Sequence, residues 1–137
     1  MGEGKKLQIR NSTVDFLVFT KDAEENGIEV RVQEDTVWLT QKAIGQLFDI
    51  DRSVVTKHLK KIFTDGELDE NSVCAFFAQV ADNGKTYRYK FYSLPAIIAV
   101  GYRVNSQRAT QFRQWATKVQ LAGAEGFFIY KAQRAQN

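Results

Sequence analysis

The stretch TQKAIGQLFDIDRSVVTKHLKKIF, residues 40–63, contains two helical patterns with only three residues between them. Residues 41–48 and residues 52–63 each repeat apolar side chains at the spacing of one buried helix face. In the first pattern these side chains are Ile44, Leu47 and Phe48. In the second pattern they are Val55, Leu59 and Ile62. We therefore predict two amphipathic helices joined by a tight turn.

The residues at the ends of the two patterns suit the turns that they would have to make. Thr40 and Asp51 stand where an N-cap residue accepts a hydrogen bond from the first free N–H groups of a helix. Asp49 ends the first helix, because aspartate tolerates the left-handed backbone conformation better than most residues. Ile50 can then insert its side chain between the helices. The spacing thus favours a defined turn over a flexible loop.

A helix-turn-helix motif places four residue types in a fixed order. It needs a small residue where the second helix crosses the first, a turn residue four positions later, an apolar residue, and an apolar anchor in the second helix. Gly45, Asp49, Ile50 and Val55 meet these requirements in that order. The pattern predicts a helix-turn-helix, although the alternative of two ordinary helices in a bundle remains open.

The outward face of the second helix would combine hydrogen-bond donors with positive charge. Its members are Arg52, Ser53, Thr56, Lys57, Lys60 and Lys61. A recognition helix carries donors for base edges in its first turns and cations for phosphates further along. The amide of Gln41, at the start of the first helix, can reach a phosphate from that position. We expect these seven residues to contact double-stranded DNA; a lysine-rich solvated face is the alternative.

Two alternating segments flank the turn sequence ADNG. Residues 73–80 (VCAFFAQV) and 85–92 (KTYRYKFY) should form a β-hairpin, since Asn-Gly accepts positive φ angles. A hairpin after a recognition helix is a winged-helix arrangement. Lys85, Arg88 and Lys90 could then lie along the DNA backbone or in the minor groove; an ordinary hairpin with a solvated basic face is the alternative. The aromatic side chains that alternate with them should face the core, namely Tyr87, Tyr89 and Phe91.

The rest of the chain completes a single α+β domain. Residues 14–20, 28–32 and 37–39 read as short strands of a small antiparallel sheet. A buried helix should follow Ser93 over residues 94–102, and a second one should begin at Asn105 or Ser106. We therefore predict α+β, a small antiparallel sheet with a winged helix-turn-helix-like core and two C-terminal helices. The DNA-binding domain would span residues 1–120, and residues 121–137 would be a tail of uncertain structure.

Charge and composition indicate the partner and the compartment. Residues 83–124 contain no acidic residue but several basic ones, which favours an anionic partner, although a solvated basic face is the alternative. Cys74 is the only cysteine, which fits a reducing cytoplasm. No apolar run approaches the roughly 20 residues that span a bilayer. The first dozen residues lack the apolar stretch of a secretory signal. We expect a soluble, cytoplasmic protein.

Residues with catalytic potential are few and isolated. His58, the only histidine, lies among lysines, where a surface position or a phosphate contact is more common than a base. Cys74 has no second ligand at zinc spacing. Glu67, Asp69 and Glu70 could hold a cation, but a solvated loop is the simpler interpretation. We expect no enzymatic activity, cofactor, metal or small-molecule ligand.

The segment GYRVNSQRATQFRQW, residues 101–115, leaves two interpretations open. Its polar residues could form a second backbone-binding or partner-binding surface, or Asn105 could cap a helix with the charges simply solvated. Helix-turn-helix proteins usually bind DNA as dimers. Candidate contacts for a homodimer are Phe112, Trp115 and Val119 with the apolar segment 127–130.

Four segments resemble the RhuM family of bacterial virulence-associated proteins. They are VWLTQKAIGQLF, IFTDGELDENSVC, GKTYRYKFYSL and AVGYRVNSQRATQFRQWATKV, within residues 28–120. Members usually continue after WATKV as a longer helix, whereas this chain reads QLAGAEGFFIY. The family is described as DNA-binding and occurs in pathogenicity islands, phage-like elements and restriction-modification clusters. The resemblance implies a transcriptional regulator in a virulence or mobile-element locus. The alternative is an interaction adaptor for a toxin or restriction-modification component; a nuclease is a more distant third.

Overall fold

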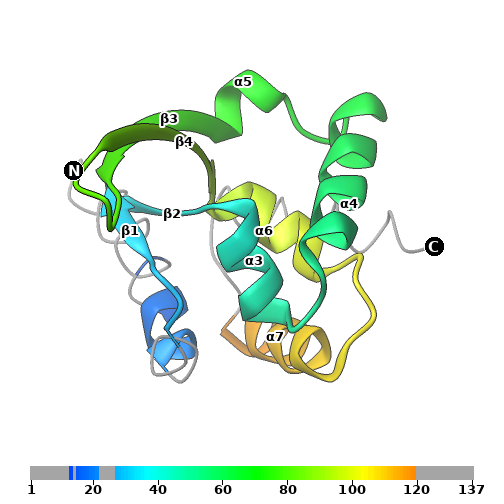
Figure 1. Cartoon of the computed structure of the whole chain (residues 1–137). Coiled ribbons are helices and arrows are strands. Elements are labelled where there is room, and N and C mark those ends of the chain that lie inside the picture. The colour runs from blue at the N-terminus through cyan, green and yellow to red at the C-terminus, as the bar shows by residue number, and fades with distance from the viewer. Residues whose placement is uncertain (1–12, 14, 22–26, 120–137) are drawn as a thin grey trace, which may run out of the picture.

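The computed structural model describes residues 13, 15–21 and 27–119, and within them the chain is an α+β structure (Figure 1). Its antiparallel sheet has the strand order β1-β2-β4-β3. The strands are β1 (Arg31–Gln33), β2 (Thr36–Leu39), β3 (Cys74–Val80) and β4 (Thr86–Ser93). Helices lie mainly on one side of this curled sheet. The predicted combination of a small antiparallel sheet with helices is confirmed.

Five helices are bounded within the described residues. They are α3 (Gln41–Phe48), α4 (Arg52–Thr64), α5 (Glu70–Val73), α6 (Leu94–Gly101) and α7 (Gln107–Val119). The two helices predicted from residues 41–48 and 52–63 are therefore α3 and α4, and the two predicted C-terminal helices are α6 and α7. The predicted strand at 28–32 is shorter, since β1 begins only at Arg31.

Helix α6 forms the centre of the core. All of its residues except Pro95 are buried, because it packs against α4, α7 and strands β2 and β4. Gly101 at its end allows the closest approach: a Cβ atom there would lie 2.5 Å from ring carbons of Phe112 and 2.8 Å from the ring of Phe48. Both rings are fully buried. The apolar sequence of α6 is therefore explained by contacts on all its sides.

The N-terminal segment corrects one prediction. Residues 15–19 are helical rather than extended, so the strand predicted over 14–20 is wrong; residue 14 lies outside the described part. Phe16 and Thr20 are fully buried, and Phe19 packs against the rings of Phe112 and Trp115. Positions 16, 19 and 20 share one face of a helix. The apolar, β-branched composition concealed this spacing.

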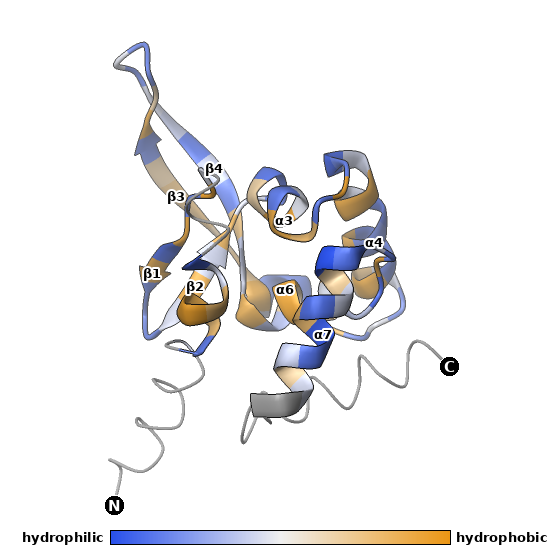
Figure 2. Cartoon of the chain, turned by 90° about the horizontal axis from the view of Figure 1, so that it is seen from below, coloured by the Kyte–Doolittle hydropathy of each residue, from blue (hydrophilic) through white to orange (hydrophobic). Residues whose placement is uncertain are grey.

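The hairpin confirms one prediction and corrects another. Strands β3 and β4 pair without interruption from Cys74 to Val80, as the alternation predicts. Phe91 is buried, but Tyr87 and Tyr89 are 41% and 40% exposed, so the prediction that all three face the core is wrong. The outer part of the hairpin extends beyond the helices (Figure 2). Tyr87 and Tyr89 lie on this part of β4, toward the turn.

Candidate nucleic-acid interface

The turn between α3 and α4 is built as its residues predict. The hydroxyl of Thr40 accepts a hydrogen bond from the N–H of Ala43 at 3.1 Å, and Asp49 has φ 56° and ψ 50°, in the left-handed region. The carboxylate of Asp51 accepts from the N–H of Ser53 at 2.9 Å. Hydrogen bonds from the hydroxyl and the N–H of Ser53 lower the pKa of Asp51. Both N-caps and the helix end are confirmed.

Gly45 is the point of closest approach between α3 and the turn. A Cβ atom at Gly45 would lie 2.9 Å from the carbonyl oxygen of Ile50 and 3.7 Å from a methyl group of Val55. The N–H of Ile50 in turn donates to the carbonyl of Gly45 at 2.9 Å. Because Gly45 has no side chain, the turn and the start of α4 can lie close to α3.

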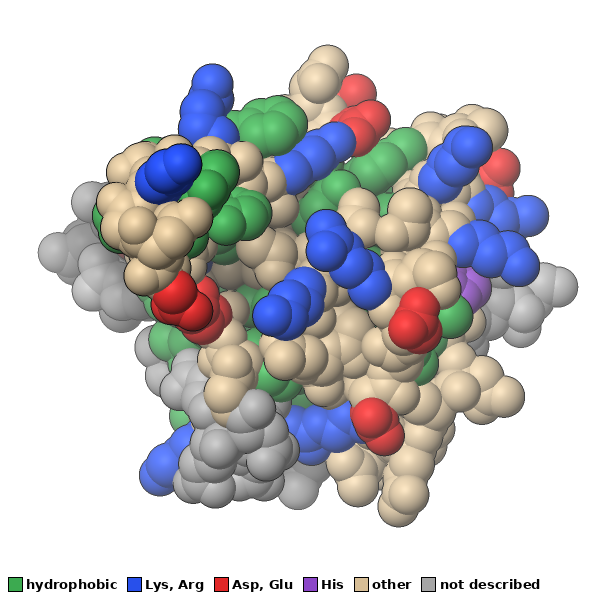
Figure 3. All heavy atoms as spheres, in the orientation of Figure 1, with side chains coloured by type: hydrophobic (Ala, Val, Ile, Leu, Met, Phe, Trp, Pro, Cys, Tyr) green, Lys and Arg blue, Asp and Glu red, His purple; other side chains and the backbone are tan. Residues whose placement is uncertain are grey.

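The buried and the exposed faces of α4 carry different types of residue. Val55, Leu59 and Ile62 are buried, which confirms the predicted inner face. The outer residues are exposed: Arg52, Ser53, Thr56, Lys57, Lys60 and Lys61. Within the described residues, none of the four cations forms an ion pair. Figure 3 shows basic side chains spread over this side of the molecule, from the hairpin to α4.

Three of the predicted contact residues also bond within the protein. Gln41 is half-buried; its amide nitrogen donates to the hydroxyl of Tyr92 at 2.8 Å, and its amide oxygen accepts from the hydroxyl of Thr56 at 2.5 Å. Ser53 donates its hydroxyl to Asp51. Gln41 thus joins α3, α4 and β4. A role for Gln41 in positioning α4 accompanies its predicted role as a phosphate contact.

The basic residues of the hairpin differ in whether their charged groups are paired with other side chains. Lys85 is exposed beside the turn, and its N–H donates to the side chain of Asn83 at 2.9 Å. Arg88 is exposed, with its guanidinium 5.5 Å from the ring centre of Phe76. Lys90 is ion-paired with Glu70, and this hydrogen bond raises the pKa of Lys90. Lys85 and Arg88 are therefore better placed than Lys90 to contact an anion.

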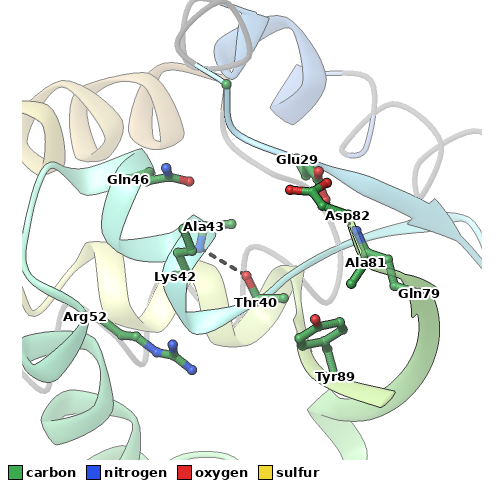
Figure 4. A pocket seen from close by; sticks show the side chains of 11 residues that line it. Glu29, Thr40, Lys42, Ala43, Gln46, Arg52, Gln79, Ala81, Asp82 and Tyr89 are labelled. Atoms are coloured by element: carbon green, nitrogen blue, oxygen red, sulfur yellow. Dashed lines mark hydrogen bonds between the residues drawn. The ribbon is translucent and has the colours of Figure 1, made fainter. Parts of the chain in front are cut away.

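A hollow of about 360 Å³ lies between the start of α4 and the hairpin (Figure 4). Arg52 points into it from α4, near Lys42 and Gln46 of α3. The opposite wall consists of Glu29, Gln79, Asp82 and Tyr89. Lys42 and Gln46 were missed from the sequence, although both lie on the face of α3 opposite its buried stripe. The helix side of the hollow is basic, whereas the hairpin side also carries two carboxylates.

Several polar side chains of residues 101–115 form contacts within the protein. Arg113 donates to the carbonyls of Gly101 and Val104, each at 2.9 Å. Arg103 pairs with Glu67 at 2.9 Å, and the two side chains are only 12% and 10% exposed. The residue that caps α7 is Ser106 rather than Asn105, because the hydroxyl of Ser106 accepts from the N–H of Ala109. These contacts favour the capping interpretation over a second binding surface.

Four side chains that could take part in catalysis are either ion-paired or partly buried. Glu67 and Glu70 form the two ion pairs described above. His58 is half-buried beside Lys61 and Arg103, and its pKa is lowered by burial, then by the charges of Arg103 and Lys57. Burial raises the pKa of Cys74 to about 11. Among the described residues, no three His, Cys, Asp or Glu side chains are grouped to hold a metal ion.

The predicted dimer contacts lie partly outside the described residues. Phe112 is fully buried, and Trp115 packs against Phe16 and Phe19 of the same chain. The side chain of Val119 and the segment 127–130 are not described. Within the described part of the chain, no helix has the length and apolar character needed to cross a membrane.

Comparison with known proteins identifies one family. No curated protein and no solved structure matches the chain. The model of the Virulence protein RhuM family matches residues 72–134. This range is the C-terminal part of the chain and contains the hairpin, α6 and α7, whereas the resemblance in the sequence was placed over residues 28–120, in the N-terminal region. Residues 72–134 of the chain are similar to the Virulence protein RhuM family.

Proposed function

We propose that the chain binds double-stranded DNA through α4 and acts as a transcriptional regulator in a virulence or mobile-element locus. The observation that carries this proposal is the outer face of α4. It presents Arg52, Lys57, Lys60 and Lys61 to solvent without ion pairs among the described residues. A face of this length with one sign of charge suits the phosphates that border a groove.

The first turns of α4 would enter the major groove in a helix-turn-helix arrangement. Arg52 is the best candidate for base recognition, because it is exposed and an arginine can pair bidentately with guanine. The hydroxyls of Ser53 and Thr56 already donate within the protein, so they would act toward bases mainly as acceptors. Lys57, Lys60 and Lys61 would hold the phosphates along the groove.

The hairpin would act as the wing. Lys85 and Arg88 are exposed on it and would contact a backbone that runs past α4. Lys42 would add a further contact from α3, beside Arg52. Glu29 and Asp82 on the hairpin side of the hollow would repel a phosphate, so the backbone should pass over the rim of the hollow rather than through it.

Selection of bound sequences from a random duplex library at about 150 mM salt tests the proposal, because purely electrostatic binding is already weakened there. Arg52→Ala should cost about 1–3 kcal/mol on a selected site and relax preference at one base position. Lys85→Ala is the matched control and should weaken binding to all sequences alike. Equal losses on every duplex for both variants would contradict base recognition by α4.

A second candidate is an adaptor for a toxin or restriction-modification component. The exposed Phe76 and Val80 on the hairpin favour it, since large apolar side chains that face solvent together often mark protein contacts. Absence of duplex binding at low salt would favour this candidate over DNA binding.

A further inference from the structure

Strand β3 lies at the edge of the sheet that the described residues form. Among the described strands, β3 pairs with β4 only. Proteins usually protect such an edge with charged side chains, proline or a bulge. The β3 sequence, CAFFAQV, has no charge and no proline, and its pairing with β4 runs without a bulge from Cys74 to Val80. An edge of this kind is suited to pairing with another strand.

The hydrogen bonds of the hairpin determine which backbone groups face outward. The N–H of Ala81 donates to the carbonyl of Lys85 at 2.8 Å, so these two residues form a hydrogen-bonded pair. Such pairs alternate along an antiparallel ladder. The N–H and C=O groups of Phe76, Ala78 and Val80 therefore point away from β4, toward the open edge.

The same three residues carry an apolar pattern that is symmetric about Ala78. Phe76 is 54% exposed and Val80 is 67% exposed, on the same face of the strand. We propose that β3 pairs antiparallel with β3 of a second copy of the chain, with the two-fold axis at Ala78. Phe76 of each copy then lies opposite Val80 of the other, and the two small Ala78 side chains meet at the axis.

A second copy fits this edge better than a charged partner strand would. Pairing about Ala78 places no charged residue of β3 opposite another, since the strand has none. The outer part of the hairpin also stands clear of the helices, so two copies can approach there (Figure 2). One added strand pair with four large apolar side chains is a small interface, which predicts a weak dimer with a dissociation constant of about 1–100 µM. The proposal does not depend on DNA binding.

Sedimentation velocity of the full chain without DNA, at about 1–300 µM, tests the proposal across the concentrations at which such a weak dimer should form. The wild-type chain should pass from monomer to dimer over this range. Val80→Lys should raise the dissociation constant at least about tenfold, because a lysine on the edge replaces an apolar contact and blocks pairing. Thr86→Lys is the control: it adds the same charge directly opposite Val80 on β4, away from the edge. It should leave the constant unchanged within about twofold.

Cross-linking locates the contact. In a Cys74→Ser background, Ala78→Cys should form a disulfide-linked dimer when copper(II)–phenanthroline transfers the thiol electrons to oxygen, since the two Cα atoms would lie about 5.5 Å apart. Thr86→Cys in the same background should stay largely monomeric. A chain that remains monomeric would overturn the proposal and leave a strand of another protein as the occupant. A dimer that Val80→Lys does not weaken would place the contact elsewhere and overturn it equally.

Discussion

Replacement of Lys57, Lys60 and Lys61 with alanine should weaken DNA binding without affecting the fold. The three side chains are exposed and form no ion pair among the described residues, and alanine is a better helix former than lysine. The free energy of unfolding should therefore change by less than about 0.5 kcal/mol. Each lost phosphate contact lowers the slope of log K against log salt by about 0.9, so three contacts lower it by about 2.7.

This slope gives a measurable difference between the proteins. Between 50 and 200 mM salt, the wild-type chain should lose about fortyfold more affinity than the triple alanine variant. Fluorescence anisotropy with a labelled duplex at four or five salt concentrations measures both slopes. The triple arginine variant is the control, because it keeps the charges and should retain the wild-type slope. An unchanged slope in a folded alanine variant would remove α4 from the interface and refute the reasoning.

Two further predictions concern stability. Gly101→Ala should lower the free energy of unfolding by about 1–3 kcal/mol in urea denaturation, because its methyl group would meet the fully buried rings of Phe112 and Phe48; a smaller penalty in a Phe112→Leu background would confirm the clash. His58 should make the fold less stable as the pH falls below about 6.5, since its pKa is lower in the folded than in the unfolded chain and the unfolded chain therefore binds more protons. His58→Gln should flatten the pH dependence of the urea midpoint between about pH 7 and 5, and an unchanged profile would contradict this assignment.

Local signals in the sequence were enough to predict the α3–turn–α4 region. Thr40, Asp49 and Asp51 have side chains or backbone preferences that act on their immediate neighbours, so their roles do not depend on the rest of the fold. Gly45 was identified by spacing alone, and the 2.9 Å approach to Ile50 gives the physical reason. The hairpin was predictable for the same reason, because its turn sequence and alternation are local.

Features that depend on distant contacts were not predictable in this way. The segment 14–20 has the composition of a strand, but Phe16 and Phe19 find their partners on α7, about a hundred residues later. Tertiary packing of this kind overrides β-propensity. Tyr87 and Tyr89 alternate with charged residues as core residues should. A single sequence does not reveal, however, that the hairpin extends beyond the helices.

The contacts of Gln41 connect the locally predictable helices α3 and α4 with the distant strand β4, and they affect how α4 would bind DNA. Its amide joins Tyr92 at the base of the hairpin to Thr56 in the middle of α4, and the ring of Tyr92 stacks on Phe63 further along the same helix. The hairpin base, the start of α3 and the length of α4 are thereby held in one arrangement. When a protein must order its binding surface on association, the cost of that ordering lowers its affinity. Because this network fixes the hairpin base relative to α4 in the free chain, the exposed cations on α4 would meet a duplex with little of that cost.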